Sequence, residues 1–214
     1  MKLTLPRDID MLITGHRHAF VSHYKASAEI TPEGAKLVAM DIKLYSNGGF
    51  SHDLSGPVVD RAIFHVDNCY MFPNLRVEGV VCKTAQASHT AFRGFGGPQG
   101  MVAVEHVMEH LALECDVDIG KLRRSNMYKE GDITHFGMIV GESDSGKWHV
   151  PGMWDRLQRE LNIDQRREEI EAFNSKNKWT KRGAALIPTK FGLAFTSKFM
   201  NQGGALVHLS LIHI

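Results

Sequence analysis

The chain lacks several features that would assign a protein to a class at once. Its 25 Lys and Arg residues nearly balance its 24 Asp and Glu residues, leaving a net charge of +1, and no basic run stands out. This composition does not indicate a nucleic acid or an anionic membrane as a partner. No apolar run has transmembrane length, and no signal-like apolar segment opens the chain.

Cysteine is also scarce. The three cysteines are odd in number and widely spaced, at positions 69, 82 and 115. That pattern argues against a disulfide framework and against a cysteine-based metal site. We therefore expect a protein of a reducing compartment, namely the cytoplasm, with the peroxisome as the alternative.

What the chain does carry is a glycine-rich loop, residues 91–101, with the sequence Ala-Phe-Arg-Gly-Phe-Gly-Gly-Pro-Gln-Gly-Met. Glycine adopts positive φ and leaves the backbone uncovered, so successive N–H groups can point at an oxyanion or a metal-oxo group. The loop therefore predicts an active-site segment in which Phe95, held between glycines, faces a flat ligand.

The first half of the chain alternates between predicted strands and helices. Two extended runs, residues 24–30 and 35–45, flank a turn at residues 31–34 and predict a β-hairpin. Ser55 as N-cap and an early Pro57 predict a helix that carries Arg61. A further helix opens at Pro98 and buries an apolar stripe. The stripe comprises Met101, Val104, Val107, Met108 and Leu111.

The second half is less regular. Three segments are predicted helices, with Asp164 as the N-cap of the last: residues 121–126, 154–161 and 164–173. Three apolar runs are predicted strands: residues 183–188, 191–197 and 203–209. The fold class is therefore mixed, α/β or α+β.

Both ends of the chain look truncated. The first residues carry no cap or turn, and the last apolar run ends without a closing turn. We expect residues 1–209 to form part of a cofactor-binding domain, and residues 210–214 to be an atypical tail, with foreign sequence as one interpretation.

A short histidine motif offers one alternative chemistry. His106, Glu109 and His110 match the H-x-x-E-H order of one class of zinc peptidase, with the histidines one helical turn apart. No third ligand is identifiable, so a solvated helix face is the favoured interpretation.

Several stretches together resemble the molybdopterin-binding domain of the xanthine dehydrogenases, which are molybdenum hydroxylases. They follow the family's order from Pro6 to about His208, with gaps of similar length. The stretches are residues 7–15, 60–68, 91–101, 127–132, 188–196 and 199–202. The resemblance implies part of a large enzyme that also carries 2Fe-2S clusters and FAD and is usually a homodimer. Such an enzyme oxidises hypoxanthine and xanthine towards urate and passes the electrons to NAD.

The resemblance also assigns site residues. The backbone N–H of Arg93 would lie near the molybdenum centre, with Gly94, Phe95 and Gly96 beside the cofactor, and no side chain of this chain would ligate the metal. Arg61 would meet the negative charge that develops on a purine oxygen. The remaining contacts would come from the rings of Phe95 and Phe195, from a hydrogen bond of Thr196, and from the apolar approach lined by Leu54 and Met200.

Aldehyde oxidases form a sister family. They typically lack an arginine at the position of Arg61 and carry a bulky residue at that of Gly97, so the resemblance favours xanthine dehydrogenase. A non-catalytic interaction domain of the same fold is a third hypothesis, but a decayed site has no physical reason to keep two arginines and two aromatics. The family's catalytic glutamate belongs to a segment outside this chain, so the chain alone is expected to be inactive.

Overall fold

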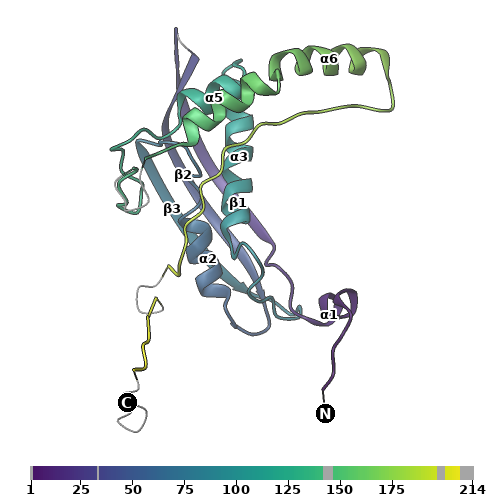
Figure 1. Ribbon diagram of the computed structural model, residues 1–214, viewed down its shortest axis with the longest axis vertical. Coiled ribbons are helices and arrows are strands. Elements are labelled where there is room, and N and C mark those ends of the chain that lie inside the picture. The colour runs from purple at the N-terminus through teal and green to yellow at the C-terminus, as the bar shows by residue number, and fades with distance from the viewer. Residues whose placement is uncertain (1, 33, 142–146, 197–200, 208–214) are drawn as a thin grey trace, which may run out of the picture.

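The computed structural model describes residues 2–32, 34–141, 147–196 and 201–207. Its centre is a sheet in the order β1–β2–β3, with α2 and α3 packed across one face (Figure 1). β1 (Phe20–Thr31) and β2 (Gly34–Gly49) pair antiparallel, which confirms the predicted hairpin. β3 (Asn74–Lys83) pairs with β2 in parallel. The mixed fold class is thereby confirmed.

The crossover between the parallel strands runs through α2 (Ser55–Ile63). Parallel strands need such a connection, because a tight turn cannot bring the chain back in the same direction. The helix packs its apolar side on the sheet, with Val58 and Ala62 fully buried. The chain then turns at residues 64–69 and forms a β-bridge at Tyr70 before it enters β3. This arrangement places the end of α2 and the following turn at the centre of the molecule.

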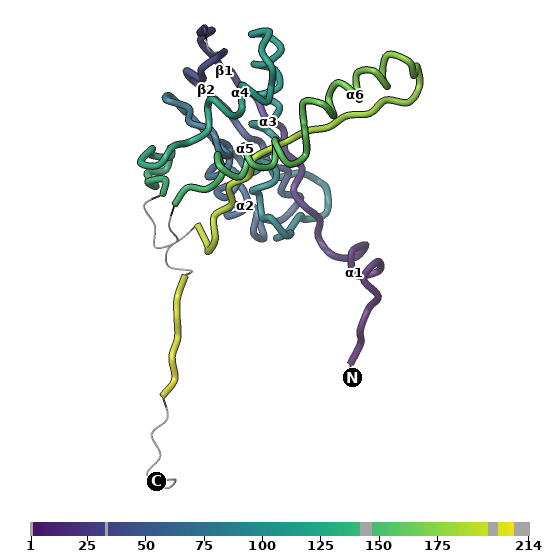
Figure 2. The backbone as a smooth tube through the Cα atoms, turned by 45° about the horizontal axis from the view of Figure 1, so that its top comes forward, coloured from purple at the N-terminus to yellow at the C-terminus, as the bar shows by residue number. Residues whose placement is uncertain are grey.

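α3 (Gly97–Glu114) covers the rest of this face. Val104, Val107, Met108 and Leu111 are buried as expected, whereas Met101 is only partly buried. The later helices are α4 (Ile119–Ser125), α5 (Val150–Glu160) and α6 (Ile163–Lys176), and a short α1 (Arg7–Ile13) precedes the sheet. Figure 2 shows α6 projecting from the body, with the following segment returning alongside it. Among the described residues, no helix combines the length and apolar character needed to span a bilayer.

Both predicted N-caps are wrong. Leu54 precedes α2 as its cap residue, and the Ser55 hydroxyl lies 2.7 Å from the buried Nε2 of His18 instead. α6 begins after Asn162, which adopts the left-handed region at φ 47°, while Asp164 lies inside its first turn. In both cases a nearby side chain or backbone conformation outcompetes the local capping signal.

The predicted C-terminal strands are also wrong. Residues 183–188, 191–196 and 203–207 form no strand, while residues 197, 208 and 209 lie outside the described residues. The chain between Pro188 and Ala194 instead meets side chains of α2 and its following turn. Met200 and the tail, residues 210–214, also lie outside the described residues.

α4 has a side-chain cap that can be tested. Asp118 accepts the backbone N–H of Lys121 at 2.8 Å and pairs with Arg167 at 2.9 Å. Asp118→Ala should lower the free energy of unfolding by about 1 kcal/mol, because the capped donor loses its partner. Urea-induced unfolding measures this, with Asp164→Ala as the control, since Asp164 is not a cap and should lose only about 0.3 kcal/mol.

Candidate functional site

Arg61 lies on the last turn of α2, and its guanidinium contacts backbone carbonyls. Nη1 donates to the carbonyl of Gly192 at 2.8 Å, and Nη2 donates to that of Ala194. Its side chain is largely buried and lies 5.4 Å from the centre of the Phe191 ring. Burial lowers the pKa of Arg61 from its ordinary value. The hydrogen-bond partners of this guanidinium are therefore backbone carbonyls of a segment distant in sequence.

A cavity of about 530 Å³ opens beside Arg61 and is lined by Phe195 and Thr196 as well. Three of the predicted substrate residues therefore meet at one hollow. The remainder of the wall is mainly apolar and includes Phe136 and Trp148. Asn201 fixes the backbone of Phe195, accepting its N–H at 2.8 Å and donating to its carbonyl at 3.0 Å. The cavity suits a flat ligand with a few polar atoms.

Two other predicted substrate residues lie away from this cavity. Phe95 is partly buried in the glycine-rich loop and is not part of the cavity wall. Leu54 stands at the opposite end of α2 from Arg61 and is 37% exposed. The arrangement of a purine between Phe95 and Phe195 stays a prediction, as do the roles of Leu54 and Met200.

The glycine-rich loop has the predicted positive φ at Gly94 and Gly96, but not at Gly97, which begins α3. Gly94, Phe95 and Gly96 all have positive φ, at 95°, 48° and 92°. A Cβ on Gly96 would overlap the carbonyl oxygen of Val58, and one on Gly97 would overlap the ring of Phe191. These glycines are therefore required for close packing on α2 and on the later chain. The sequence suggested that glycine is needed here to leave the backbone uncovered, and this packing is a second reason for glycine.

The backbone of Arg93 faces an incompletely paired region. Its carbonyl accepts from Nη2 of Arg17, whose guanidinium lies 4.8 Å from the centre of the Phe92 ring. Its amide finds no acceptor in the part of the chain that the structure describes. Four buried side-chain atoms nearby likewise have no partner among the described residues. They are Nη1 of Arg17, Nδ1 of His18, Nδ1 of His89 and Oε1 of Gln99.

Such unpaired polar atoms are costly in an interior unless a ligand or water meets them. Arg17 adjoins the loop through Arg93, and Gln99 Nε2 donates to the carbonyl of His18 at 3.2 Å. The donors and acceptors present therefore fit a polar cofactor at this loop, in contact with backbone N–H groups rather than with metal-ligating side chains.

Sequence reasoning missed the residues that join the loop to the cavity. The ring of Phe191 adjoins Gly97 on one side and packs 4.8 Å from the ring of His65 on another. Lys190 donates to the buried carboxylate of Asp67 at 2.7 Å. Asp67 also accepts from the hydroxyl of Tyr128 at 2.9 Å. Phe191, His65 and Lys190 gave no signal in the periodicity of the sequence, because their partners are distant in sequence.

The histidine motif on α3 is occupied by structural contacts. Nδ1 of His106 lies 2.8 Å from the carbonyl of Val102, and Nδ1 of His110 meets the hydroxyl of Tyr24. Glu109 accepts from Arg123 at 2.7 Å. Over the described ranges, no group of three His, Cys, Asp or Glu side chains is placed to hold a metal ion. All three side chains are exposed, as the solvated-face interpretation expects.

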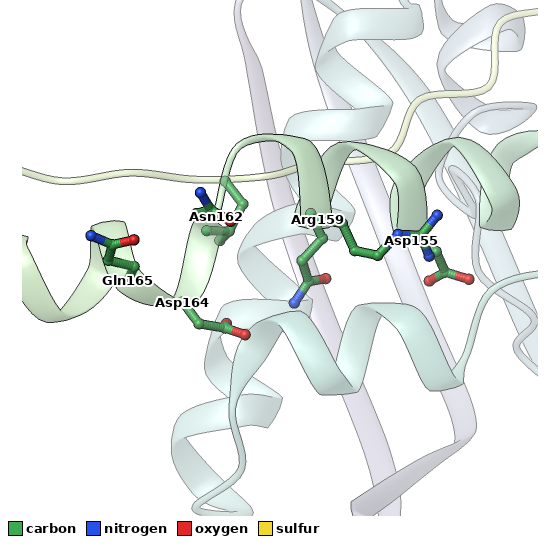
Figure 3. A pocket seen from close by; sticks show the side chains of 7 residues that line it. Asp155, Arg159, Asn162, Asp164 and Gln165 are labelled. Atoms are coloured by element: carbon green, nitrogen blue, oxygen red, sulfur yellow. The ribbon is translucent and has the colours of Figure 1, made fainter.

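A polar hollow at the α5–α6 junction is a second candidate (Figure 3). Figure 3 shows Arg159 beside Asp155. Arg124 holds both oxygens of that carboxylate, at 2.7 and 2.8 Å, and this contact lowers the pKa of Asp155. The carboxylate is thus already neutralised, and the hollow lacks unpaired groups of the kind found at the loop.

Comparison with known proteins identifies the domain family of the chain. A family model described as a molybdopterin cofactor-binding domain matches residues 1–127, and a second of that description matches residues 156–211. Over 209 residues the chain is 46% identical to a xanthine dehydrogenase of Emericella nidulans and 47% identical to a xanthine dehydrogenase/oxidase of Mus musculus. Each match covers 98% of this chain and 15% of the relative.

A solved structure is similar as well. The aldehyde oxidoreductase of Desulfovibrio gigas matches with a TM-score of 0.64 at 26% identity, over 78% of this chain and 17% of that chain. The chain thus spans about 15% of the length of the curated relatives it matches. The resemblance predicted from the sequence is confirmed, and the chain belongs to the molybdopterin cofactor-binding domain family.

Proposed function

We propose that this chain is the cofactor- and purine-binding part of a xanthine dehydrogenase-like molybdenum hydroxylase. The carrying observation is that Arg61, Phe195 and Thr196 line one cavity. The 46–47% identity to xanthine dehydrogenases supports the choice of a purine as substrate. The molybdenum cofactor, when bound, supplies the oxidative hydroxylation chemistry that no side chain can provide.

In this proposal, the residues of this chain bind and orient the cofactor and the purine. The backbone amide of Arg93 and the adjoining glycines are proposed to contact the cofactor, while Phe195 packs on the purine and Thr196 hydrogen-bonds it. Arg61 is proposed to stabilise negative charge on a purine oxygen, and its low exposure would strengthen that interaction. Its bonds to two carbonyls hold the guanidinium in position before substrate arrives.

For the whole enzyme we propose hypoxanthine and xanthine as substrates and urate as product. Electrons would leave through 2Fe-2S clusters and FAD to NAD, with oxygen as the alternative acceptor. A homodimer in the cytoplasm is part of the same proposal, with the peroxisome as the alternative site.

Aldehyde oxidation is the second candidate, favoured by the similarity to an aldehyde oxidoreductase structure. Replacing Arg61 with methionine in the complete enzyme separates the two. The kcat/KM for xanthine should fall roughly thirtyfold to a thousandfold, because a guanidinium hydrogen bond to developing charge is worth about 2–4 kcal/mol. An aromatic aldehyde, which lacks that oxygen, should lose less than about threefold.

Steady-state kinetics on both substrates, with molybdenum content as the check on loading, measure this difference. Arg124→Met is the matched control, since Arg124 pairs with Asp155 at a distance from the cavity. Equal losses on both substrates would contradict the role given to Arg61.

A further inference from the structure

The chain from Pro188 to Ala194 is irregular, yet side chains hold it closely. Asn68 donates to the carbonyl of Pro188 at 2.8 Å, and Asp67 accepts from Lys190 at 2.7 Å. Further along, His65 Nε2 receives the backbone N–H of Gly192 at 3.1 Å. A segment without strand partners therefore depends on side chains for its backbone hydrogen bonds.

His65 is fixed in one tautomer by two contacts. Its Nδ1 lies 2.7 Å from the carbonyl oxygen of Arg61, and a carbonyl can only accept, so Nδ1 carries the hydrogen. Nε2 is then the bare nitrogen, which the amide of Gly192 requires as an acceptor. The side chain is 3% exposed, so water has little access to either nitrogen.

The consequences reach Arg61 and the cavity wall. Gly192 and Ala194 supply the two carbonyls that hold the Arg61 guanidinium. Ala194 has φ 70°, a strained conformation that persists only where surrounding contacts impose it. Arg61, on the last turn of α2, binds the carbonyl of Gly192, and His65, just after that helix, binds the N–H of the same residue.

We propose that His65 is a positioning residue for substrate, acting by accepting the Gly192 amide and so placing Arg61 and the wall of Phe195 and Thr196. Its effect on purine turnover rests on the proposed function, while the positioning itself does not. Lys190 and Asn68 hold the earlier part of the segment, so the part that follows Gly192 depends on His65 and Arg61 together with Asn201.

Protonation would break this contact. Burial lowers the pKa of His65, and the cations of Lys190 and Arg61 lower it further, while the Arg61 carbonyl and Asp67 raise it. α3 approaches the backbone of His65 through Gly100, which carries no charge. Because the folded pKa lies below the ordinary value, the contact is complete at neutral pH. It is lost as the pH falls through the folded pKa, when Nε2 gains a hydrogen.

Hydrogen exchange with mass spectrometry on the complete enzyme tests the proposal. His65→Phe keeps a ring and removes the acceptor, so exchange of the peptide 188–196 should rise about five- to thirtyfold. His65→Gln offers an acceptor at a similar reach and should restore most of the protection. His106→Phe is the matched control, because His106 makes the same Nδ1 contact four residues back but lies exposed on α3.

The pH dependence gives a second readout. In the natural protein, exchange of this peptide, corrected for the intrinsic rate, should rise as the pH falls through the lowered pKa of His65, while in His65→Gln it should not. The hairpin peptides, residues 20–49, report whether His65→Phe is folded. If the hairpin peptides also lose protection, His65→Phe is not folded, and the proposal is then tested by comparing the pH profiles of the natural protein and His65→Gln.

Kinetics complete the test. The kcat/KM for xanthine should fall about tenfold in His65→Phe and recover in His65→Gln. Unchanged exchange at 188–196 in His65→Phe, or identical pH profiles in the natural protein and His65→Gln, would overturn the proposal. Altered exchange in an enzyme that never oxidises xanthine would leave the positioning role intact and refute the proposed function instead.

Discussion

Gly96→Ala should lower the free energy of unfolding by about 3–5 kcal/mol, the sum expected for a strained backbone and an overpacked contact. Gly96 has φ 92°, where an L side chain is strained in any surroundings. In addition, the new methyl group would overlap the carbonyl of Val58 in α2. A backbone atom cannot move aside as a flexible side chain can, so α2 and the loop must separate.

Gly131→Ala is the matched control for this substitution. Gly131 has a similar φ of 88°, and nothing lies within 4 Å of its added Cβ. It should therefore show the backbone strain alone, about 1 kcal/mol. Urea-induced unfolding measures both variants, and molybdenum content in the complete enzyme should fall for Gly96→Ala but not for Gly131→Ala. Equal losses of stability would show that the contact with α2 is not what requires glycine.

Arg123→Met should also destabilise the protein by about 3–5 kcal/mol, because it leaves a buried carboxylate without its cation. Arg123 is 2% exposed and donates to Glu105 at 2.9 Å and to Glu109 at 2.7 Å. Glu105 also accepts from Asn68 at 2.9 Å and from Tyr70 at 2.7 Å. The loss therefore reaches Asn68, which holds Pro188.

Arg124 provides the comparison. It forms an ion pair with Asp155 in which the side chains are 43% and 41% exposed, so Arg124→Met should change stability by about 0–1 kcal/mol. A combined Arg123→Met and Glu105→Gln variant should recover part of the loss, since the uncompensated charge is gone. Thermal unfolding of the four proteins measures these differences. Similar losses of stability in Arg123→Met and Arg124→Met would show that burial does not make the Arg123 ion pair more important for stability than the exposed one.

The sequence predicted those elements whose signals are local. The alternation in the hairpin and the stripe on α3 follow the periods of a strand and a helix, and both were confirmed. β3 was not predicted. It pairs with β2 in parallel, and α2 separates the two strands in the sequence, so no local turn signal links them. Its Gly79 makes room for Val59 and Ile63 of that helix, which a single sequence does not reveal.

The site was predictable in a different way. Positive φ at Gly94 and Gly96 followed from residue type, whereas that at Phe95 did not, and the role proposed for Arg61 came from the family resemblance. His65 and Phe191 could not be singled out, because their contacts join residues more than ninety positions apart in the sequence. The failed strand predictions share this cause, since an apolar run cannot indicate that its hydrogen bonds will come from side chains.

The ring of Phe191 gives the two halves of the site a shared wall. It adjoins Gly97 of the loop and packs against His65 and beneath Arg61. A ligand that shifts the loop at Gly97 must therefore shift this ring and, with it, the groups that face the cavity. Thermodynamic linkage makes such a coupling reciprocal. If the proposed function holds, the factor by which the cofactor raises the affinity for a purine equals the factor by which a purine raises the affinity for the cofactor.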